Sequence, residues 1–578
     1  MNLLELKYAQ ILAEARAMRT SVEGRPYRIA ILTNLTIAPL SGILEWALLS
    51  EGVAAEIRLA EFDNIVQEAE TLTDVDAAIV FWDAANLAED LPALADLYEA
   101  ERLDEIADAT AAAIDRTLDS LARTPLVLMN TFSALAFERD ALAPGGLGRL
   151  CDALNARLRD RADANLLLVD LDKVYAATGL DAALDFRQFQ SAKTLHTVGF
   201  LKHWVLHVLP AFRSATGRAR KLLAVDCDNT LWRGIIGEDG EDGVQMDDLT
   251  TDGAAFQEAQ RILKAWRRQG VLLAIVSKNN PEDVDRVLAD HPAMQLRDED
   301  FVAKKVGWGE KADGLRALAD ELNLGLDSFV FLDDSPFELE RIAQALPQVE
   351  RLQVPARISD YPAMLRAAHG LFFTLSKSSE DLQRTEMYRT DVARKRTQTQ
   401  YASLDDYLAS LGLKVVVEEG GRLGVSRAAQ MTQKTNQFNL TTRRYTEADI
   451  ARFTGDPDTI AATFSVSDRF GDYGVTGLVI ATIDRKGATA HLDTFLMSCR
   501  VLGRRIENAV MNWLAERLRR DGISSLSGEY LRTAKNAQVA DLLERMGFEY
   551  LVTAEGMTYR LDLLACEPHT LPNIEIAA

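Results

Sequence analysis

Cysteine is scarce in this sequence, which has only four cysteines among its 578 residues. They are Cys151, Cys227, Cys499 and Cys566, and no two of them form a C-x-x-C pair. This spacing argues against a zinc site and against a disulfide framework. Few, widely separated cysteines are typical of proteins from a reducing compartment.

Long apolar runs and an excess of positive charge are also absent. No stretch approaches the ~18 consecutive apolar residues of a membrane-spanning helix. Residues 1–19 mix charges into a helical apolar pattern, unlike a signal peptide. The formal net charge of −23 would repel the phosphate backbone of nucleic acids. We therefore expect a soluble, cytoplasmic protein that binds neither membranes nor nucleic acid.

The sequence predicts an α/β protein of three domains. In residues 1–218, apolar runs such as those from Tyr27 and Ala77 alternate with helical patterns, which indicates a parallel sheet. The alternation recurs in residues 219–375, with the strands "KLLAVD", "VLLAIVS" and "SFVFLDD". A linker helix opens residues 376–578, where alternating strands favour an α+β domain with a more antiparallel sheet.

Carboxylates stand where two strands of the middle region end. Asp226 and Asp228 follow "KLLAV", and Asp333 and Asp334 follow "SFVFL". Because ligand sites of open α/β sheets lie beyond the carboxyl ends of the strands, we expect these side chains to meet in one crevice. Mg²⁺ prefers such hard oxygen ligands, and its charge would offset the repulsion between them. The sequence therefore predicts a Mg²⁺ site.

A hydroxyl and an ammonium group lie between these carboxylate pairs in the sequence. Ser277 ends "LLAIVS", and Lys311 follows in "VGWGEK". A transferring phosphoryl group needs such partners for its equatorial oxygens. The short stretch between Asp226 and Ser277 leaves little room for a large cap domain. We therefore expect an open site that admits a bulky or protein-borne substrate.

This ordered set resembles the haloacid dehalogenase-like phosphotransferase superfamily. Its first motif has the form DxDx(T/V), here residues 226–230, and Ser277, Lys311 and the Asp333/Asp334 pair stand at its second, third and fourth motifs. The resemblance implies Asp226 as the nucleophile and Asp228 as general acid and base. It implies that Mg²⁺ is held by the Asp226 side chain, the Asp228 backbone carbonyl and Asp334, with Asp333 close by.

Longer stretches are similar to the FkbH-like proteins of modular polyketide pathways. They are "DNTLWRGIIGEDG", "VSKNN", "FLDDSPFE", "QMTQKTNQFNLTTRRYT", "SDRFGDYGVTGL" and "MSCRVLGRRIE". The resemblance covers all three regions and is strongest over residues 195–550. It implies a protein that takes glyceryl from 1,3-bisphosphoglycerate, removes the phosphate and leaves D-glyceryl as a thioester on an acyl carrier protein.

The third region resembles the acetyltransferase fold that binds coenzyme A through an RxxGx(G/A) loop. Arg500 and Gly503 match that loop, but Arg505 replaces its final small residue. A modified loop could instead receive the pantetheine arm of a carrier protein. We hypothesise that Cys499, beside the loop, carries the glyceryl group as a thioester, although an isolated cysteine is often only a buried apolar residue. Cys227 ranks lower, because its side chain should point away from the flanking aspartates.

The first region resembles the SGNH-hydrolase-like N-terminal part of the same family. It lacks the Gly-Asp-Ser nucleophile of such hydrolases and a clear Asp-x-x-His motif. Thr33, Thr36 and Ser41 are poor substitutes for the missing serine. We therefore expect a docking or scaffold role for this region and no esterase activity.

Several polar residues of the third region allow two interpretations. The amides of residues 436–439 either complete a polar loop or recognise glyceryl hydroxyls and pantetheine amides. Arg443 and Arg444 are either solvated or contact an acidic carrier protein, and His491 is either a general base or a satisfied strand residue.

Two other functions also stay open for the whole chain. One is a plain Mg²⁺-dependent phosphatase of a small metabolite with a separate N-acyltransferase domain. The other is a non-catalytic scaffold of a biosynthetic complex.

Overall fold

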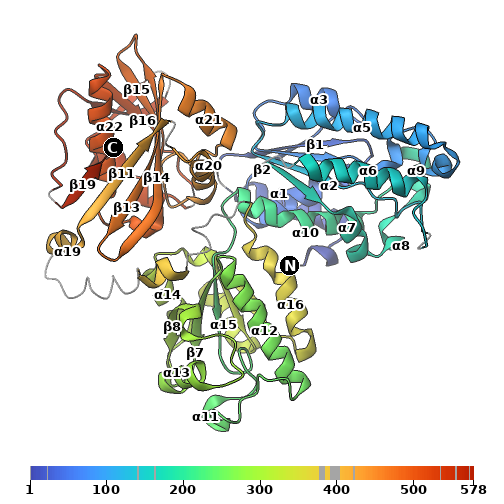
Figure 1. Cartoon of the computed structure of the whole chain (residues 1–578), viewed down its shortest axis with the longest axis horizontal. Helices are drawn as coiled ribbons and strands as arrows, with labels where there is room; N and C mark the ends of the chain where they lie inside the picture. Colours follow the sequence, from blue (N-terminus) through green and yellow to red (C-terminus); the bar gives the residue numbers. More distant parts are fainter. Residues whose placement is uncertain are drawn as a thin grey trace. The chain divides into compact units, whose positions relative to one another are not determined.

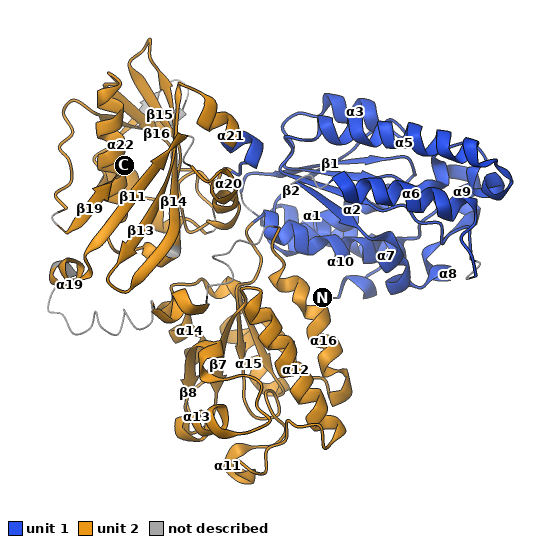
Figure 2. Cartoon of the chain, in the orientation of Figure 1, with its two compact units in different colours: residues 1–216, 444–450 blue, residues 217–443, 451–578 orange. Residues whose placement is uncertain are grey.

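The computed structural model describes most of the chain (Figure 1): residues 2–22, 24–139, 142–161, 165–375, 385–390, 404–420, 423–533, 535–553, 556–571 and 573–577. It divides into two compact units (Figure 2), one of residues 1–216 with 444–450, the other of residues 217–443 with 451–578. The predicted boundaries of three domains therefore stay a prediction. In the part of the chain that the structure describes, no helix is both long enough and apolar enough to cross a membrane.

The first unit contains a parallel five-stranded sheet in the order β2-β1-β3-β4-β5. Its strands are β1 (Tyr27–Thr33), β2 (Ala55–Leu59), β3 (Ala77–Phe81), β4 (Leu126–Asn130) and β5 (Leu166–Val169). The longer helices are α1 (Tyr8–Arg19), α2 (Pro39–Ser50), α3 (Ile65–Thr71), α5 (Ala100–Ser120), α6 (Gly146–Arg161), α7 (Leu171–Thr178), α9 (Phe186–Ala192) and α10 (Val198–Ala215), and the short ones are α4 (Leu91–Leu94) and α8 (Leu180–Ala183). Strands β3 and β4 are buried along their whole length, as expected when helices cover both faces.

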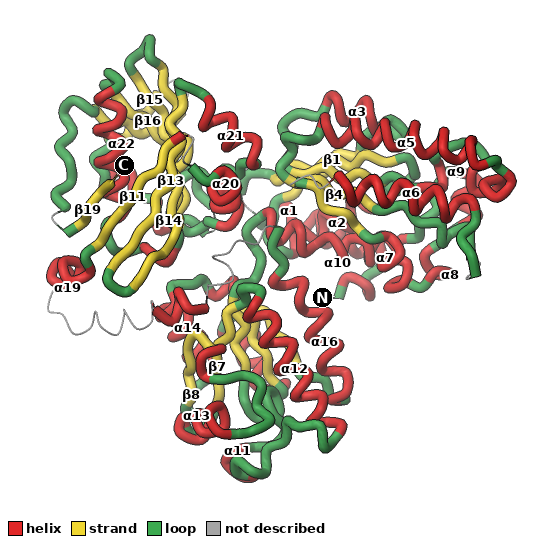
Figure 3. The backbone as a smooth tube through the Cα atoms, in the orientation of Figure 1, coloured by secondary structure: helices red, strands yellow, loops and turns green. Residues whose placement is uncertain are grey.

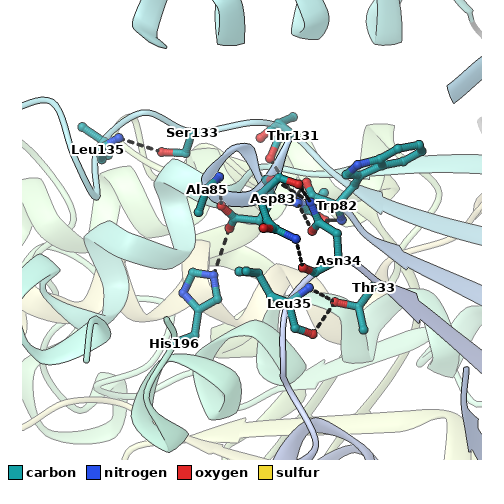
Figure 4. Close-up of polar contacts among 12 residues, drawn as sticks. Thr33, Asn34, Leu35, Trp82, Asp83, Ala85, Thr131, Ser133, Leu135 and His196 are labelled. Carbon is teal, nitrogen blue, oxygen red and sulfur yellow. Dashed lines mark hydrogen bonds and ion pairs between the residues drawn. The ribbon is translucent and has the colours of Figure 1, made fainter. Parts of the chain in front are cut away.

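Asn34 joins the ends of β1 and β3 at this sheet's carboxyl edge (Figure 4). Its side-chain nitrogen donates to the carbonyl oxygens of Asp83 at 2.9 Å and Asn86 at 3.1 Å. Its side-chain oxygen accepts from the Asp83 N–H at 2.8 Å. Asn34 is completely buried, so these bonds satisfy backbone groups that water cannot reach.

The second unit contains two sheets (Figure 3). The first is parallel, in the order β10-β9-β6-β7-β8. It consists of β6 (Leu222–Val225), β7 (Leu272–Ser277), β8 (Phe301–Val306), β9 (Phe329–Asp333) and β10 (Glu350–Gln353). Its helices are α11 (Ile236–Asp239), α12 (Thr251–Arg268), α13 (Pro281–Asp290), α14 (Lys311–Leu322), α15 (Pro336–Ala345) and α16 (Tyr361–Ala368). Only α11 and α12 lie between β6 and β7, so no large cap domain is inserted there.

The other sheet has nine strands in the order β17-β18-β16-β15-β14-β13-β11-β19, with β12 paired to β15. They are β11 (Leu413–Glu419), β12 (Phe438–Asn439), β13 (Thr459–Asp468), β14 (Gly471–Asp484), β15 (Thr489–Met497), β16 (Ser525–Gly528), β17 (Glu549–Thr553), β18 (Gly556–Asp562) and β19 (Ile574–Ala577). The helices are α19 (Leu404–Leu411), α20 (Val425–Lys434), α21 (Glu447–Gly455), α22 (Ile506–Arg520) and α23 (Leu542–Arg545).

Most strand pairs of this sheet are antiparallel, as predicted; β11–β19 and β15–β16 are parallel. The predicted linker helix falls largely outside the described residues, although residues 385–390 are helical.

We predict that Asn34→Ala destabilises the protein by about 2–4 kcal/mol, because it leaves buried backbone N–H and C=O groups without partners. Urea unfolding of the full chain measures this change. Asn64→Ala is the matched control, because the Asn64 side chain makes no capping bond to α3. Equal effects of the two substitutions would contradict the role given to Asn34.

Candidate active site

Asp226 follows β6 and lies against two of the predicted side chains. One carboxylate oxygen accepts a hydrogen bond of 2.7 Å from Ser277 Oγ, at the end of β7. The other oxygen lies 3.1 Å from Nζ of Lys311, the first residue of α14. All three residues are buried. The structure therefore brings the predicted nucleophile, hydroxyl and ammonium together at one edge of the sheet.

Lys311 also pairs with Asp333, whose Oδ2 lies 2.6 Å from Nζ. Asp333 ends β9, is completely buried and accepts a second bond, of 2.8 Å, from the Ser335 N–H. Burial raises the pKa of Asp226 to about 6 even though Lys311 opposes this rise. Burial alone would lower the pKa of Lys311, but the charges of Asp226 and Asp333 outweigh it and raise this pKa. Lys311 is therefore a charged group between two carboxylates.

Asp228 is oriented by three N–H donors. Its Oδ1 accepts bonds from Trp232 Nε1 at 2.9 Å and from the Ile236 N–H at 3.2 Å. Its Oδ2 accepts a bond of 3.1 Å from Asn279 Nδ2, which also donates to Ser277 Oγ at 3.1 Å. The sequence analysis gave no role to Trp232 or Asn279. A signal existed, since Asn279 lies two residues after Ser277 in the stretch "VSKNN".

Three carboxylates could share a metal ion. Oxygens of Asp226, Asp333 and Asp334 lie within 4.8 Å of one another. Burial raises the pKa of Asp334, and the charge of Asp226 adds to this rise, so an ion here would relieve repulsion. Hard oxygens in this number fit Mg²⁺. The Asp228 side chain is not part of this group, and the predicted contribution of Asp228 is its backbone carbonyl.

Comparisons with known proteins find similarity to phosphatases. No protein-family model matches the chain. It is 27% identical to enolase-phosphatase E1 of Methylococcus capsulatus over 218 residues, which are 37% of this chain and 81% of that protein. The N-terminal part of protein BF1531 from Bacteroides fragilis, containing a phosphatase domain and solved with Mg, covers 64% of this chain and 100% of its own. That match has a TM-score of 0.57 at 22% identity. The chain is thus similar in sequence to one phosphatase over 218 residues and similar in fold to a solved structure that contains a phosphatase domain.

A much smaller likeness involves acetyltransferases. The ribosomal-protein-S18-alanine N-acetyltransferase from Escherichia coli matches 26% of this chain and 94% of its own. Its TM-score is 0.20 at 16% sequence identity.

The other predicted site residues, Cys499, Arg500 and Gly503, lie in the segment that connects β15 of the nine-stranded sheet to α22. The backbone of Cys499 begins a 3-10 turn (Cys499–Val501), and its side chain lies outside the described part of the structure. Arg500 Nε donates to Ser498 Oγ at 3.0 Å. Gly503 and Arg505 both have a positive φ, of 77° and 60°. Glycine adopts this conformation without the ~1–2 kcal/mol that a side chain adds, so Arg505 occupies a position whose backbone favours the small residue of the resembled loop.

Cys227, the competing thiol, packs in the apolar core behind the site. It is completely buried, and this burial raises the pKa of its thiol well above the ordinary value. The thiol therefore stays protonated at neutral pH and is a poor nucleophile.

Asn439, in the predicted polar loop of residues 436–439, bonds to the backbone of its own segment. Asn439 is completely buried: its Nδ2 donates to the Thr435 carbonyl at 3.1 Å, and its Oδ1 accepts from the N–H of Thr441 at 3.3 Å and of Thr442 at 2.8 Å. Ligand recognition by Asn439 is thus a wrong interpretation, because its amide is already satisfied.

Two further residues of this region also have internal partners. Arg443 forms ion pairs with Asp493 and Glu529, and His491 Nδ1 lies 3.1 Å from Ser527 Oγ. His491 is therefore better interpreted as a satisfied strand residue than as a general base. Arg443 is not merely solvated, because both of its acidic partners lie within the same region.

The first unit contains a buried acid–histidine pair that the sequence analysis missed (Figure 4). His196 Nε2 lies 3.0 Å from Asp83 Oδ2, and the His196 ring stacks on Phe200 with centroids 4.2 Å apart. The Nδ1 atom has no hydrogen-bond partner among the described residues. The Thr33 hydroxyl is bonded to the backbone of Leu35, and Ser41 Oγ to the carbonyl of Ala38. These hydroxyls are therefore not activated by the pair.

We predict that Lys311→Met destabilises the metal-free protein by about 3–5 kcal/mol at pH 8, because two buried carboxylates lose their shared cation. The loss should shrink at pH 5, where Asp226, with its pKa raised further by the substitution, is protonated and uncharged. Urea unfolding at both pH values measures the effect.

Lys278→Met is the matched control, because the Lys278–Glu338 pair is nearer to solvent and should contribute about 0–1 kcal/mol. A loss for Lys311→Met that does not change with pH would contradict the electrostatic cause.

Proposed function

We propose that this chain is a Mg²⁺-dependent glyceryl transferase/phosphatase. It takes glyceryl from 1,3-bisphosphoglycerate, removes phosphate and loads D-glyceryl onto an acyl carrier protein as a thioester. The observation that carries the phosphatase part is the Asp226 carboxylate, which is buried against Ser277 and Lys311. The acyl-transfer part rests on the sequence resemblance, which extends over all three regions.

The phosphoryl group moves in two steps. Asp226 attacks phosphorus, the bond from phosphorus to the leaving oxygen breaks, and the protonated Asp228 gives that oxygen its proton. Asp228, now a carboxylate, takes a proton from a water molecule that attacks the aspartyl-phosphate. This releases inorganic phosphate and restores Asp226. The Trp232, Ile236 and Asn279 donors hold the Asp228 carboxylate ready for this second step.

Lys311 and Ser277 bind the phosphoryl oxygens during both steps. The ammonium is within reach of Asp226 and stays charged, so it stabilises the charge that develops on the transferring group. Mg²⁺ would be held by Asp226, Asp334 and the Asp228 carbonyl, with Asp333 close by, and would supply further positive charge to the transferring group. In the acyl-transfer part of the proposal, the Cys499 thiolate attacks the acyl carbon of 1,3-bisphosphoglycerate and the acyl phosphate leaves as inorganic phosphate. The pantetheine thiol of the carrier then attacks this thioester, takes the acyl group and releases Cys499.

We predict that Mg²⁺ raises the thermal unfolding temperature of the wild-type chain and that Asp334→Asn removes most of this rise. A ligand at 100 times its dissociation constant stabilises the folded state by about 2.7 kcal/mol. Differential scanning calorimetry with and without Mg²⁺ measures the shift. Asp313→Asn, at an exposed position of α14, is the control and should keep it. An unchanged shift in Asp334→Asn would remove this carboxylate from the metal site.

The function itself is tested by the mass of a phosphopantetheinylated carrier protein. The carrier is incubated with the chain, Mg²⁺ and 1,3-bisphosphoglycerate, and we expect a glyceryl adduct that Asp226→Asn and Cys499→Ala both abolish. Intact mass spectrometry detects the adduct and distinguishes glyceryl from phosphoglyceryl.

Phosphate release without any adduct on the carrier would contradict glyceryl loading and favour a plain phosphatase. An adduct that forms normally with Asp226→Asn, without its phosphate, would contradict the role of Asp226. If neither phosphate nor adduct appears, the scaffold function is favoured.

A further inference from the structure

The exposed large apolar side chains of residues 219–375 lie at one edge of the sheet β10-β9-β6-β7-β8. In described residues 219–375 they are Ile235, Leu249, Trp308 and Phe337, exposed by 40%, 85%, 72% and 66%. Ile235 and Leu249 follow β6, Trp308 follows β8, and Phe337 follows β9. All four therefore lie beyond the carboxyl ends of the strands, where Asp226 also lies.

Trp308 is fixed to the turn that carries catalytic groups. Its indole Nε1 donates a bond of 3.1 Å to Asn280 Oδ1. Asn280 follows Asn279, whose side chain bonds to both Asp228 and Ser277. The Trp308 ring is thus bonded to the residue next to Asn279, whose side chain contacts Asp228, the predicted general acid and base.

Phe337 is connected to the same two loops. The Arg341 guanidinium lies 5.6 Å from the centre of its ring, and Arg341 pairs with Glu310 at 2.7 Å, two residues after Trp308. The next residue, Glu338, pairs at 2.7 Å with Lys278 of the Ser277–Asn280 turn. Polar contacts therefore connect the turn that carries Trp308, the first turn of α15 that carries Phe337, and the Ser277–Asn280 turn of the site.

One segment at this edge is strongly acidic. Residues 234–252 contain no lysine or arginine and seven acids, which are Glu238, Asp239, Glu241, Asp242, Asp247, Asp248 and Asp252. This segment is held near the site, since Glu241 pairs at 3.0 Å with Arg286 of α13, the helix that begins after Asn280 (Figure 1). A substrate with a neutral, partly apolar body meets less repulsion here and can cover the rings.

We propose that Trp308 and Phe337 bind the body of the substrate on the leaving-group side and so determine specificity. They select phosphate esters whose phosphoryl group is carried on a neutral body with apolar or planar groups. Under the proposed function, on which this last assignment rests, that body is the pantetheine arm of a phosphoglyceryl thioester, with its amide planes and methyl groups. Acyl loading then precedes dephosphorylation.

Two probes that do not involve glyceryl chemistry test the rings. p-Nitrophenyl phosphate offers a planar body, and acetyl phosphate offers almost none. Loss of one aromatic contact should lower kcat/KM for p-nitrophenyl phosphate by about 3- to 10-fold in Trp308→Ala and in Phe337→Ala, mainly through KM. Acetyl phosphate hydrolysis should stay within about 2-fold.

Conservative and remote variants complete this experiment. Trp308→Phe keeps a ring and should restore most of the loss. Leu564→Ala removes an exposed leucine from the turn that follows β18 and should not change kcat/KM for either substrate. Equal losses for both substrates, or no loss for either, would overturn the assignment. Because Trp308 and Phe337 are exposed, unfolding temperatures should not change, which excludes a folding defect.

A second pair of substrates separates this inference from the proposed function. Phosphate release is compared between S-(3-phosphoglyceryl)pantetheine and free 3-phosphoglycerate. If phosphate is released faster from the thioester, and Trp308→Ala removes this difference, the result supports the role of the rings in binding and the order in which acyl loading precedes dephosphorylation. Equal release from both compounds, with the p-nitrophenyl phosphate effect intact, would overturn the pantetheine assignment and leave the role of the rings standing.

Discussion

The candidate active site depends on one buried ammonium group placed between two buried carboxylates. Two ionised carboxylates at this depth would each lose hydration and repel each other. Lys311 lies 3.1 Å from Asp226 and 2.6 Å from Asp333, so a single cation offsets both penalties. The sheet order makes this possible, because β6 and β9 are neighbours and α14 starts on the same edge. Burial, with a smaller contribution from the neighbouring carboxylate, still raises the pKa of Asp226 and of Asp333, which favours a further cation at this edge.

The sequence predicts this constellation because each member ends a strand or begins a helix. Because strands alternate with helices, the strands are parallel and their carboxyl ends lie at one edge of the sheet. Asp226, Ser277 and Asp333 are therefore placed at that edge whatever the details of side-chain packing. The bonds from Trp232 and Ile236 to Asp228 could not be predicted, because they depend on the conformation of a turn in which Asn229 has a φ of 52°. Residue order does not reveal which side chains such a turn aims at each other. The pairing of Asp83 with His196 was missed for a similar reason, since 113 positions separate them.

The two parallel sheets use the same edge in opposite ways. In the first unit, Asn34 and Asn130 bond to the backbone at the ends of neighbouring strands, and the hydroxyl of Thr33 bonds to its own loop. These contacts occupy the polar groups that a ligand would need. At the carboxyl edge of the sheet β10-β9-β6-β7-β8, the strand ends instead carry charged groups, which Lys311, the Ser277 hydroxyl and several N–H donors partly compensate. The first sheet thus ends in amides bonded to the backbone, and the second in ionisable groups.

The acidic segment beside the site does not prevent phosphoryl binding, because the interactions act over different distances. Lys311 would contact a phosphoryl group directly in a buried place, where attraction between charges is strong. The acids of residues 234–252 belong mostly to exposed positions, and salt screens exposed charges over ~8 Å at physiological ionic strength. Their effect therefore falls on the part of the substrate that stays outside the site. Under the proposed specificity, a second phosphate there would be repelled, whereas a neutral arm would not. The acidic segment and the rings of Trp308 and Phe337 would then act on the same part of the substrate.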